Sequence, residues 1–403
     1  MSDSVRLGDA PETSGRGDRQ RSSAPRSLVA KIVAATPPGR DRAVDALRAI
    51  AILGVVLGHW LVTALVAPPG DDPALRVTSP LKEMPWLAPV SWALQTLAVF
   101  FFVGGYVGAR AYKPGTAYGS WVRGRMVRLL RPVPVLLVVW VPVSAGLLAA
   151  GYDGQTLRSV IKLVLSPLWF LLVYAALTAL TPLVIALWRR LGWTAVALAA
   201  AAVAATDLVR FAFDGPGWPG WANVLTGWLV PYLLGVAWAG GALDRRIAAG
   251  LLAGGAAAAA GLILVAGYPA SMVGVPGAAV SNLNPPTLAA VAFGTAQVGA
   301  AVLLRDRLAR LMDRSRWWAV VVVTNLAAMT IFLYHQTAML AVTLAGRAFG
   351  VLPGLHTRPD EPFWAVERVP WLPVFAVALA VAVAAAHRFE HPRHAKAVKG
   401  HSR

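Results

Sequence analysis

The chain has 403 residues, of which 57% are hydrophobic and only 14% are charged, and it contains no cysteine. Because soluble globular domains carry about 25% charged residues, this composition excludes an ordinary soluble domain and predicts a polytopic membrane protein without disulfides, thiolate zinc sites or cysteine nucleophiles. The net charge of +18 could suggest a nucleic-acid partner, but Lys and Arg gather in the cytoplasmic loops of membrane proteins, and we expect no nucleic acid.

The chain divides into three parts. Residues 1–40 are rich in Ser, Arg, Asp, Gly and Pro, and they predict a disordered basic cytoplasmic tail. Residues 41–392 form the predicted transmembrane domain, and residues 393–403 form a second short basic cytoplasmic tail.

Ten apolar runs follow one another through the predicted transmembrane domain. Runs of this length suit helices that cross the bilayer. We therefore expect an all-α, polytopic membrane helix bundle with about ten transmembrane helices. The runs lie near 44–66, 88–109, 132–150, 164–188, 193–213, 223–241, 247–267, 286–304, 317–345 and 370–387.

The distribution of positive charge gives the orientation. With the N-terminus inside and ten alternating spans, 28 of the 37 Lys and Arg residues lie on cytoplasmic segments and 8 lie outside. The remaining one is Arg48, inside the first span. The positive-inside rule therefore predicts that both termini are cytoplasmic.

The first span carries two ionisable residues, Arg48 and His59. Eleven residues at roughly 100° each make three turns plus about 20°, so both side chains leave one helix face about 16 Å apart. Asp45 is three residues before Arg48 and could pair with it. Such residues inside a span usually face a bundle interior or a watered cavity. The alternative is that Arg48 reaches the headgroups and His59 is an ordinary core residue.

A strongly cationic cluster precedes the third span. It could bind anionic lipid or the phosphates of a soluble donor through forked hydrogen bonds, although a topology signal alone also explains it. Its members are Arg123, Arg125, Arg128 and Arg131.

Four residues are weaker candidates for contact with a substrate, and Asp45 of the first span is one of them. Asn282 and Asn284 lie in an uncharged outer loop that could receive a hydroxylated substrate, and ordinary turn chemistry explains them equally well. His335 lies inside the ninth span, where a hydrogen-bonded core histidine is the simpler interpretation. No group of residues has the spacing of a metal site, and we expect no metal.

The chain resembles the acyltransferase 3 family of integral membrane acyltransferases over roughly residues 41–392. Each matching fragment is weak alone, but their order on ten spans is specific. The fragments are Arg48-x10-His59, Phe100–Tyr106, Arg123–Pro132, Leu168–Phe170, Asn284–Thr287, Ile331–His335 and Phe389–Pro392.

The resemblance implies transfer of an acyl group, commonly acetyl, from a cytoplasmic acyl-CoA to a hydroxyl of a carbohydrate, lipid or secondary metabolite. It also implies that Arg48 and His59 are the essential pair and that the arginines before the third span support the donor. Gly104 stands where many relatives have Ser. The expected partners are the lipid bilayer, acyl-CoA and a hydroxylated small-molecule or glycan acceptor, and the expected location is a bacterial inner (plasma) membrane.

Arg48 and His59 are suited to different chemical roles. His59 can be neutral near pH 7 and can act as a general base, whereas Arg48 stays charged and can only fix phosphate or polarise the thioester. The alternative function is a multi-span transporter or proton-coupled exporter that uses the same pair. Transporters often contain internal repeats, and none is detectable here, so the enzyme is favoured.

Overall fold

The computed structural model describes residues 28–67, 74–113, 115–213 and 215–390. Helices make up most of this part, and its one sheet pairs β1 (Ala64–Val66) with β2 (Arg76–Thr78) in antiparallel register. The predicted all-α architecture is confirmed. The motif at 389–392 extends beyond the described residues, and the tail at 393–403 lies outside them.

Nine helices of the described part are long and apolar enough to cross a membrane, and the shorter apolar helix α5 makes a tenth segment. The helices of the first half are α1 (Leu28–Ala34), α2 (Arg42–Val62), α3 (Pro80–Glu83), α4 (Ala88–Ser91), α5 (Leu97–Ala111), α6 (Tyr118–Leu130), α7 (Pro132–Ala149), α8 (Gly154–Leu165), α9 (Pro167–Ala179) and α10 (Thr181–Leu191). Those of the second half are α11 (Trp193–Phe211), α12 (Asn223–Ala239), α13 (Arg245–Leu264), α14 (Leu288–Met312), α15 (Ser315–Leu326), α16 (Ala328–Gly346), α17 (Phe363–Arg368) and α18 (Trp371–Glu390).

Three of the predicted runs are each broken into two helices, and the first of them, at 88–109, is divided between α4 and α5. The run at 164–188 changes from α9 to α10 at Leu180, where Pro182 occupies the second position of the new helix and lacks a backbone N–H. The run at 317–345 changes from α15 to α16 at Ala327. Asn325 at the end of α15 donates a hydrogen bond to the backbone oxygen of Asp45, which holds this break against α2.

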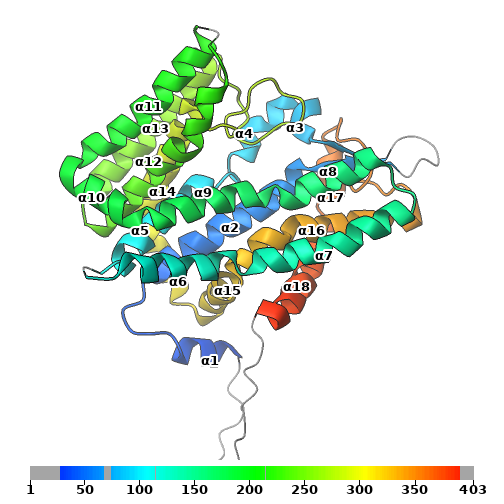
Figure 1. Ribbon diagram of the computed structural model, residues 1–403, viewed down its shortest axis with the longest axis horizontal. Coiled ribbons are helices and arrows are strands. Elements are labelled where there is room, and N and C mark those ends of the chain that lie inside the picture. The colour runs from blue at the N-terminus through cyan, green and yellow to red at the C-terminus, as the bar shows by residue number, and fades with distance from the viewer. Residues whose placement is uncertain (1–27, 68–73, 114, 214, 391–403) are drawn as a thin grey trace, which may run out of the picture.

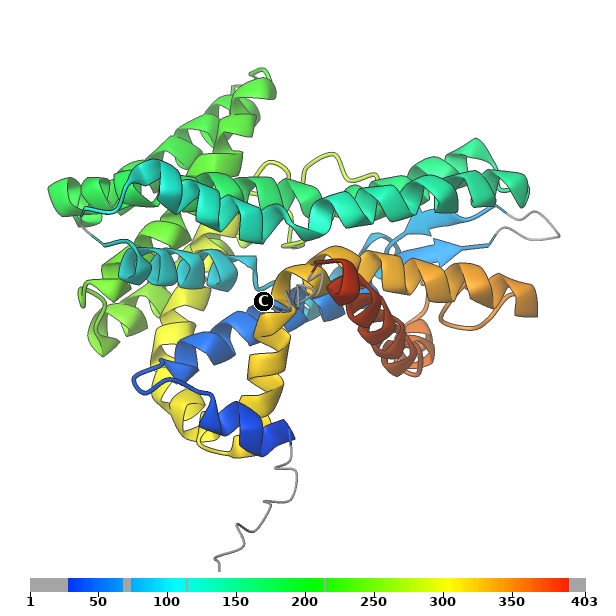
Figure 2. The same cartoon turned by 60° about the horizontal axis from the view of Figure 1, so that its bottom comes forward.

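The expectation of disorder across residues 1–40 is wrong for residues 28–40. Residues 28–34 form α1, which lies against α15 (Figure 2). Trp318 of α15 donates its indole N–H to the hydroxyl of Thr36, at 2.8 Å. Ile32 and Val33 of α1 pack against the small apolar cluster that contains Trp318. This packing compensates for the short length of the helix. Residues 1–27 lie outside the described part.

Helix α2 runs through the middle of the bundle, where it packs against α5, α14, α15 and α16 (Figure 1). It begins at Arg42 because the Asp41 carboxylate accepts a hydrogen bond from the backbone N–H of Val44. Farther along, Gly54 leaves room for Thr96, whose hydroxyl donates to the Ala51 oxygen at 2.7 Å. The small residues on α2 therefore allow the turn before α5 to approach its backbone closely.

Helices α5 and α12 also meet at glycines. A Cβ at Gly105 would collide with the backbone oxygen of Tyr232, and one at Gly235 would collide with that of Phe102. The two backbones therefore lie in direct contact, which is the usual way for spanning helices to pack in lipid. This contact fixes α5, which in turn lies against the central helix α2.

Candidate functional site

A cavity of about 330 Å³ opens beside the first half of α2. Arg48 of α2 and three arginines from α6 and its end line it together, so the structure brings two separate sequence predictions to one place. We call it the arginine cavity. Its walls are Arg48, Phe100, Arg125, Arg128, Leu129, Arg131, Pro132, Tyr174, Thr178, Asn325, Leu326, Ala328, Met329 and Thr330.

The arginine cavity is strongly cationic. No carboxylate is among its lining residues. Arg125 stacks over the Trp121 ring at 4.4 Å. Within the described part of the chain, the Arg48 guanidinium forms no ion pair and no hydrogen bond. Guanidinium groups that face an open space without a carboxylate form a site for an anion, above all for phosphate oxygens.

The expected pairing of Asp45 with Arg48 is corrected by the structure. Asp45 accepts from Arg40, at 2.5 Å from Nε and 3.3 Å from Nη2. This hydrogen bond, more than the attraction between the charges, raises the pKa of Arg40. The segment before α2 folds back to bring Arg40 to the carboxylate, and Arg48 points into the cavity instead. Asp45 therefore does not line the arginine cavity.

Arg123 lies apart from the other three arginines. It lines a neighbouring hollow of about 530 Å³, which shares Arg128 and Arg131 with the arginine cavity. On a helix, residues three apart share a face, whereas residues two apart lie about 200° from each other. Arg125 and Arg128 consequently face the cavity, and Arg123 does not.

The second half of α2 carries His59, whose ring lies against His335 of α16. The ring centroids are 5.0 Å apart and the rings meet edge to face at 60°. The Trp60 indole donates to the backbone oxygen of His335 at 2.9 Å, which holds the two helices in register. His335 is 0% exposed, and both ring nitrogens of His59 are buried. We call the two residues the histidine pair.

The expectation that His335 is a fully hydrogen-bonded core residue is only half right. Its Nδ1 lies 2.6 Å from the backbone oxygen of Phe332, but its Nε2 is buried without a partner. Both ring nitrogens of His59 are also without a partner among the described residues. Buried polar atoms without partners are costly, and three of them in one pair of rings indicate a place for a polar ligand.

Packed rings separate the arginine cavity from the histidine pair. Phe100 lines the cavity and contacts Phe170, with centroids 5.2 Å apart. Phe170 contacts Phe332 at 4.7 Å, and Phe332 contacts His335 at 5.9 Å. We call these three phenylalanines the aromatic layer. They are all buried, and neither histidine is among the residues that line the cavity.

A buried arginine at the end of α17 fixes the far end of α2. The Arg368 guanidinium is 0% exposed and donates to the backbone oxygens of Trp60, Thr63 and Gly354 at 2.9–3.0 Å. It also lies over the ring of Phe375, at 4.7 Å. The last carbonyls of a helix lack hydrogen-bond donors within the helix. Arg368 provides such donors at the end of α2. Nothing in its local sequence marks it for this role.

The predicted outer-loop residues differ from each other. Asn282 is buried and donates to the oxygens of Pro269 and Ser271, while its own oxygen accepts from Thr287. Its side-chain N–H groups are therefore both used to shape the loop, and its contact with a substrate stays a prediction. Asn284 is exposed, and its role stays a prediction.

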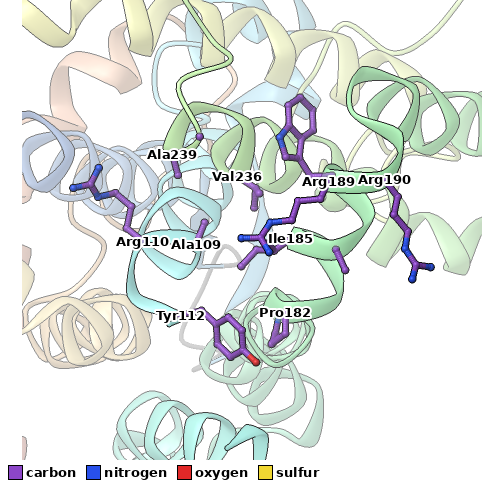
Figure 3. A pocket seen from close by; sticks show the side chains of 12 residues that line it. Ala109, Arg110, Tyr112, Pro182, Ile185, Arg189, Arg190, Val236 and Ala239 are labelled. Atoms are coloured by element: carbon purple, nitrogen blue, oxygen red, sulfur yellow. The ribbon is translucent and has the colours of Figure 1, made fainter. Parts of the chain in front are cut away.

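A larger hollow of about 640 Å³ lies elsewhere, where α5, α10 and α12 end (Figure 3). Arg110, Arg189 and Arg190 line it, and the Arg189 side chain reaches over its middle. All three helices present their C-terminal ends here, which favour cations and disfavour anions. The arginines are thus explained by the helix ends, and the hollow is a poor site for phosphate.

The described residues contain no group of three or more His, Asp and Glu that could hold a metal ion. A family model described as an acyltransferase domain matches residues 41–387. No curated protein and no solved structure gives a significant match.

Proposed function

The chain belongs to the acyltransferase 3 family, and we propose that it moves an acyl group, acetyl in the first instance, from a cytoplasmic acyl-CoA to a hydroxyl of a carbohydrate, lipid or secondary metabolite. Membership makes it a multi-pass membrane enzyme that acylates oxygen. The observation that carries the proposed donor is the arginine cavity, where Arg48 meets the arginines of the α6 region.

The proposed donor has the chemistry that this cavity can bind. Acyl-CoA carries several phosphates, and planar guanidinium groups bind phosphate oxygens two at a time. The charge distribution of the sequence places the start of α2 and the α6 region on the cytoplasmic side, where acyl-CoA is found. We propose that Arg125, Arg128 and Arg131 hold the phosphates, with Arg48 at the inner wall.

The proposed chemical step uses His59 as the general base. A neutral ring nitrogen of His59 takes the proton of the acceptor hydroxyl while the hydroxyl oxygen bonds to the thioester carbonyl carbon. The carbon–sulfur bond then breaks, and the proton passes from His59 to the departing thiolate. The products are an O-acyl ester and CoA, and His59 returns to its neutral state. An acyl-His59 intermediate is the less favoured route.

The donor must reach from the arginine cavity to the histidine pair, about 16 Å along the axis of α2. The aromatic layer fills part of this distance, so its rings must turn aside as the acyl end of the donor enters. A closed layer before entry keeps bulk water from the thioester. This arrangement supports transfer to a hydroxyl in preference to hydrolysis.

The proposed setting is a bacterial plasma membrane with both chain termini in the cytoplasm. The outer loop at 350–362 then faces the opposite side, and labelling of single cysteines in this cysteine-free chain can measure the orientation. Labelling of position 358 only from the cytoplasm would contradict it.

The function is tested with protein purified in detergent, by measuring release of CoA from acetyl-CoA with panels of hydroxylated acceptors. We expect acceptor-dependent release, which a transporter would not show. His59→Ala should lower kcat by about 10²-fold or more, the scale of a lost general base, with unchanged folding and donor binding. Near-normal turnover by a folded His59→Ala protein would refute the proposed mechanism.

A further inference from the structure

The hydrogen on His335 has a defined place. Its Nδ1 lies 2.6 Å from the Phe332 backbone oxygen, and a carbonyl oxygen can only accept a hydrogen bond. Nδ1 therefore carries the hydrogen, and the neutral ring holds its lone pair on Nε2. This Nε2 is buried without a donor, on a ring that lies edge to face with His59.

His59 can supply the hydrogen-bond donor that Nε2 of His335 lacks. A neutral imidazole has one N–H and one lone pair, and neither nitrogen of His59 has a partner in the described structure. If its N–H turns toward His335, the donor meets the unused acceptor on Nε2. The lone pair of the other nitrogen is then left for the hydroxyl of the acceptor substrate.

We infer that His335 is the positioning residue for His59, accepting its N–H and thereby fixing which nitrogen acts as the base. This inference rests on the proposed function, in which His59 removes a proton. It changes the role of His335 from a substrate contact to a residue that acts through His59. The chain of contacts is His59 N–H to His335 Nε2, and His335 Nδ1–H to the Phe332 oxygen.

The same contacts stabilise the charge that forms during reaction. When His59 takes the hydroxyl proton it becomes an imidazolium with two N–H groups. One of them still donates to His335, whose own N–H points at the Phe332 carbonyl, so both dipoles favour the cation. The new proton leaves on the other nitrogen for the CoA thiolate, and His335 neither gains nor loses a proton. An orienting acid serves the same purpose in Ser-His-Asp triads.

The surrounding frame keeps the two rings together. Trp60, next to His59, binds the His335 backbone through its indole. The Trp60 oxygen in turn accepts from the buried guanidinium of Arg368. Because these bonds use backbone atoms of His335 and Trp60, a change of the His335 side chain leaves them in place.

Three substitutions of His335 separate positioning from packing. In His335→Gln the side-chain oxygen can reach roughly the place of Nε2, in His335→Asn it can reach only the place of Nδ1, and His335→Phe has no acceptor. We expect kcat to fall about 10- to 100-fold in the Asn and Phe proteins, the scale of losing the group that orients a working histidine. The kcat of His335→Gln should be much closer to that of the unaltered protein. KM for acyl-CoA should stay within about 2-fold in all three, because the donor phosphates lie elsewhere.

A matched control is His356, which is also fully buried but has both ring nitrogens bonded, to Leu352 and Thr343. His356→Gln should alter stability and leave the kcat of the folded fraction unchanged. The inference is overturned if folded His335→Phe keeps normal kcat, or if the Gln and Asn proteins are equally slow.

A double substitution identifies the route of the effect. In a protein that already carries His59→Ala, His335→Phe should cause little further loss, because its effect passes through His59. A full second loss would make His335 an independent catalytic group and overturn its positioning role. These results are distinct from failure of the proposed function, in which the unaltered protein releases no CoA or His59→Ala is fully active.

Discussion

The two ends of α2 each involve an arginine, and the two arginines are used in opposite ways. Arg48 faces a cavity, and its side chain has no hydrogen bond or ion pair within the described residues, whereas Arg368 is sealed from solvent and bonds three backbone oxygens. A guanidinium with its donors filled by carbonyls stabilises the fold. One with free donors beside a cavity is available to an anion.

The same difference separates the two halves of the candidate site. The inner half is open, cationic and suited to a charged donor. The other half holds the histidine pair, in which His335 contacts Phe332 of the aromatic layer. A cation beside His59 would disfavour its protonation, so separating Arg48 from His59 lets one helix bind an anion at one end and move a proton at the other.

The strongest test of this comparison is Arg368→Leu. The substitution leaves the oxygens of Trp60, Thr63 and Gly354 unpaired in the interior, at about 1–3 kcal/mol each. We expect most of the folded protein to be lost, measured as yield and thermal unfolding in detergent. Arg358→Leu, at an exposed position in the loop before α17, is the control and should behave as the unaltered protein. A normal melting temperature for Arg368→Leu would contradict a structural role.

Arg48→Lys should show the opposite result. We expect a normal melting temperature, because the side chain holds no structural bond, and kcat/KM for acyl-CoA lower by about 10-fold or more, because Lys lacks the planar fork. Arg42→Lys is the control, since Arg42 bonds the Met312 oxygen away from the cavity. If Arg48→Lys lowers stability and leaves kcat/KM unchanged, the comparison of the two arginines fails.

Much of this arrangement could be predicted from sequence because it depends on local periodicity. Hydrophobic run length predicts the spanning helices, and helical spacing places Arg48 and His59 on one face. Periodicity also explains in retrospect why Arg123 leaves the set of cavity arginines. Its side chain lies two residues from Arg125, on another face of α6.

The rest depends on contacts between residues far apart in the chain, which no local pattern encodes. Trp60 and His335 are separated by 275 positions, and Trp60 and Arg368 by 308. A histidine in a span has the same local sequence whether its Nε2 is bonded or vacant. The pairing of Asp45 with Arg40 was missed for a related reason, because a turn before α2, and not helical spacing, brings the two side chains together.

A further test compares the three arginines of the α6 region that line the arginine cavity with the one that does not. Neutralising Arg125, Arg128 or Arg131 to Gln should raise KM for acyl-CoA by about 10-fold, the lower end of the range for one charge-assisted hydrogen bond, with kcat little changed. Arg123→Gln is the matched control and should have a smaller effect, because Arg123 does not line the arginine cavity. Equal effects of all four would mean that the charge of the region, and not the cavity, attracts the donor.

The smallest expected effect concerns the buried His356 and the dependence of stability on pH. Burial, above all, lowers the pKa of His356 in the loop between α16 and α17. Above about pH 6.5, the ordinary value of a histidine, the ring is neutral in both folded and unfolded protein. As the pH falls below that value, the unfolded chain takes up a proton that the folded ring resists, so His356 favours unfolding in acid.

We therefore expect the melting temperature to fall between pH 7.5 and pH 5, and to fall by a few degrees less in His356→Gln, although that protein is less stable at pH 7.5. His59 and His335 are present in both proteins, so their contributions cancel in the comparison. The lower melting temperature of His356→Gln at pH 7.5 measures the loss of the two hydrogen bonds of the ring, to Leu352 and Thr343. The difference between the two proteins in how steeply the melting temperature falls with pH measures the protonation of His356. If the melting temperatures of the two proteins fell equally with pH, the ring of His356 would be protonated as easily in the folded protein as in the unfolded chain. Its surroundings would then contain more water than its burial indicates.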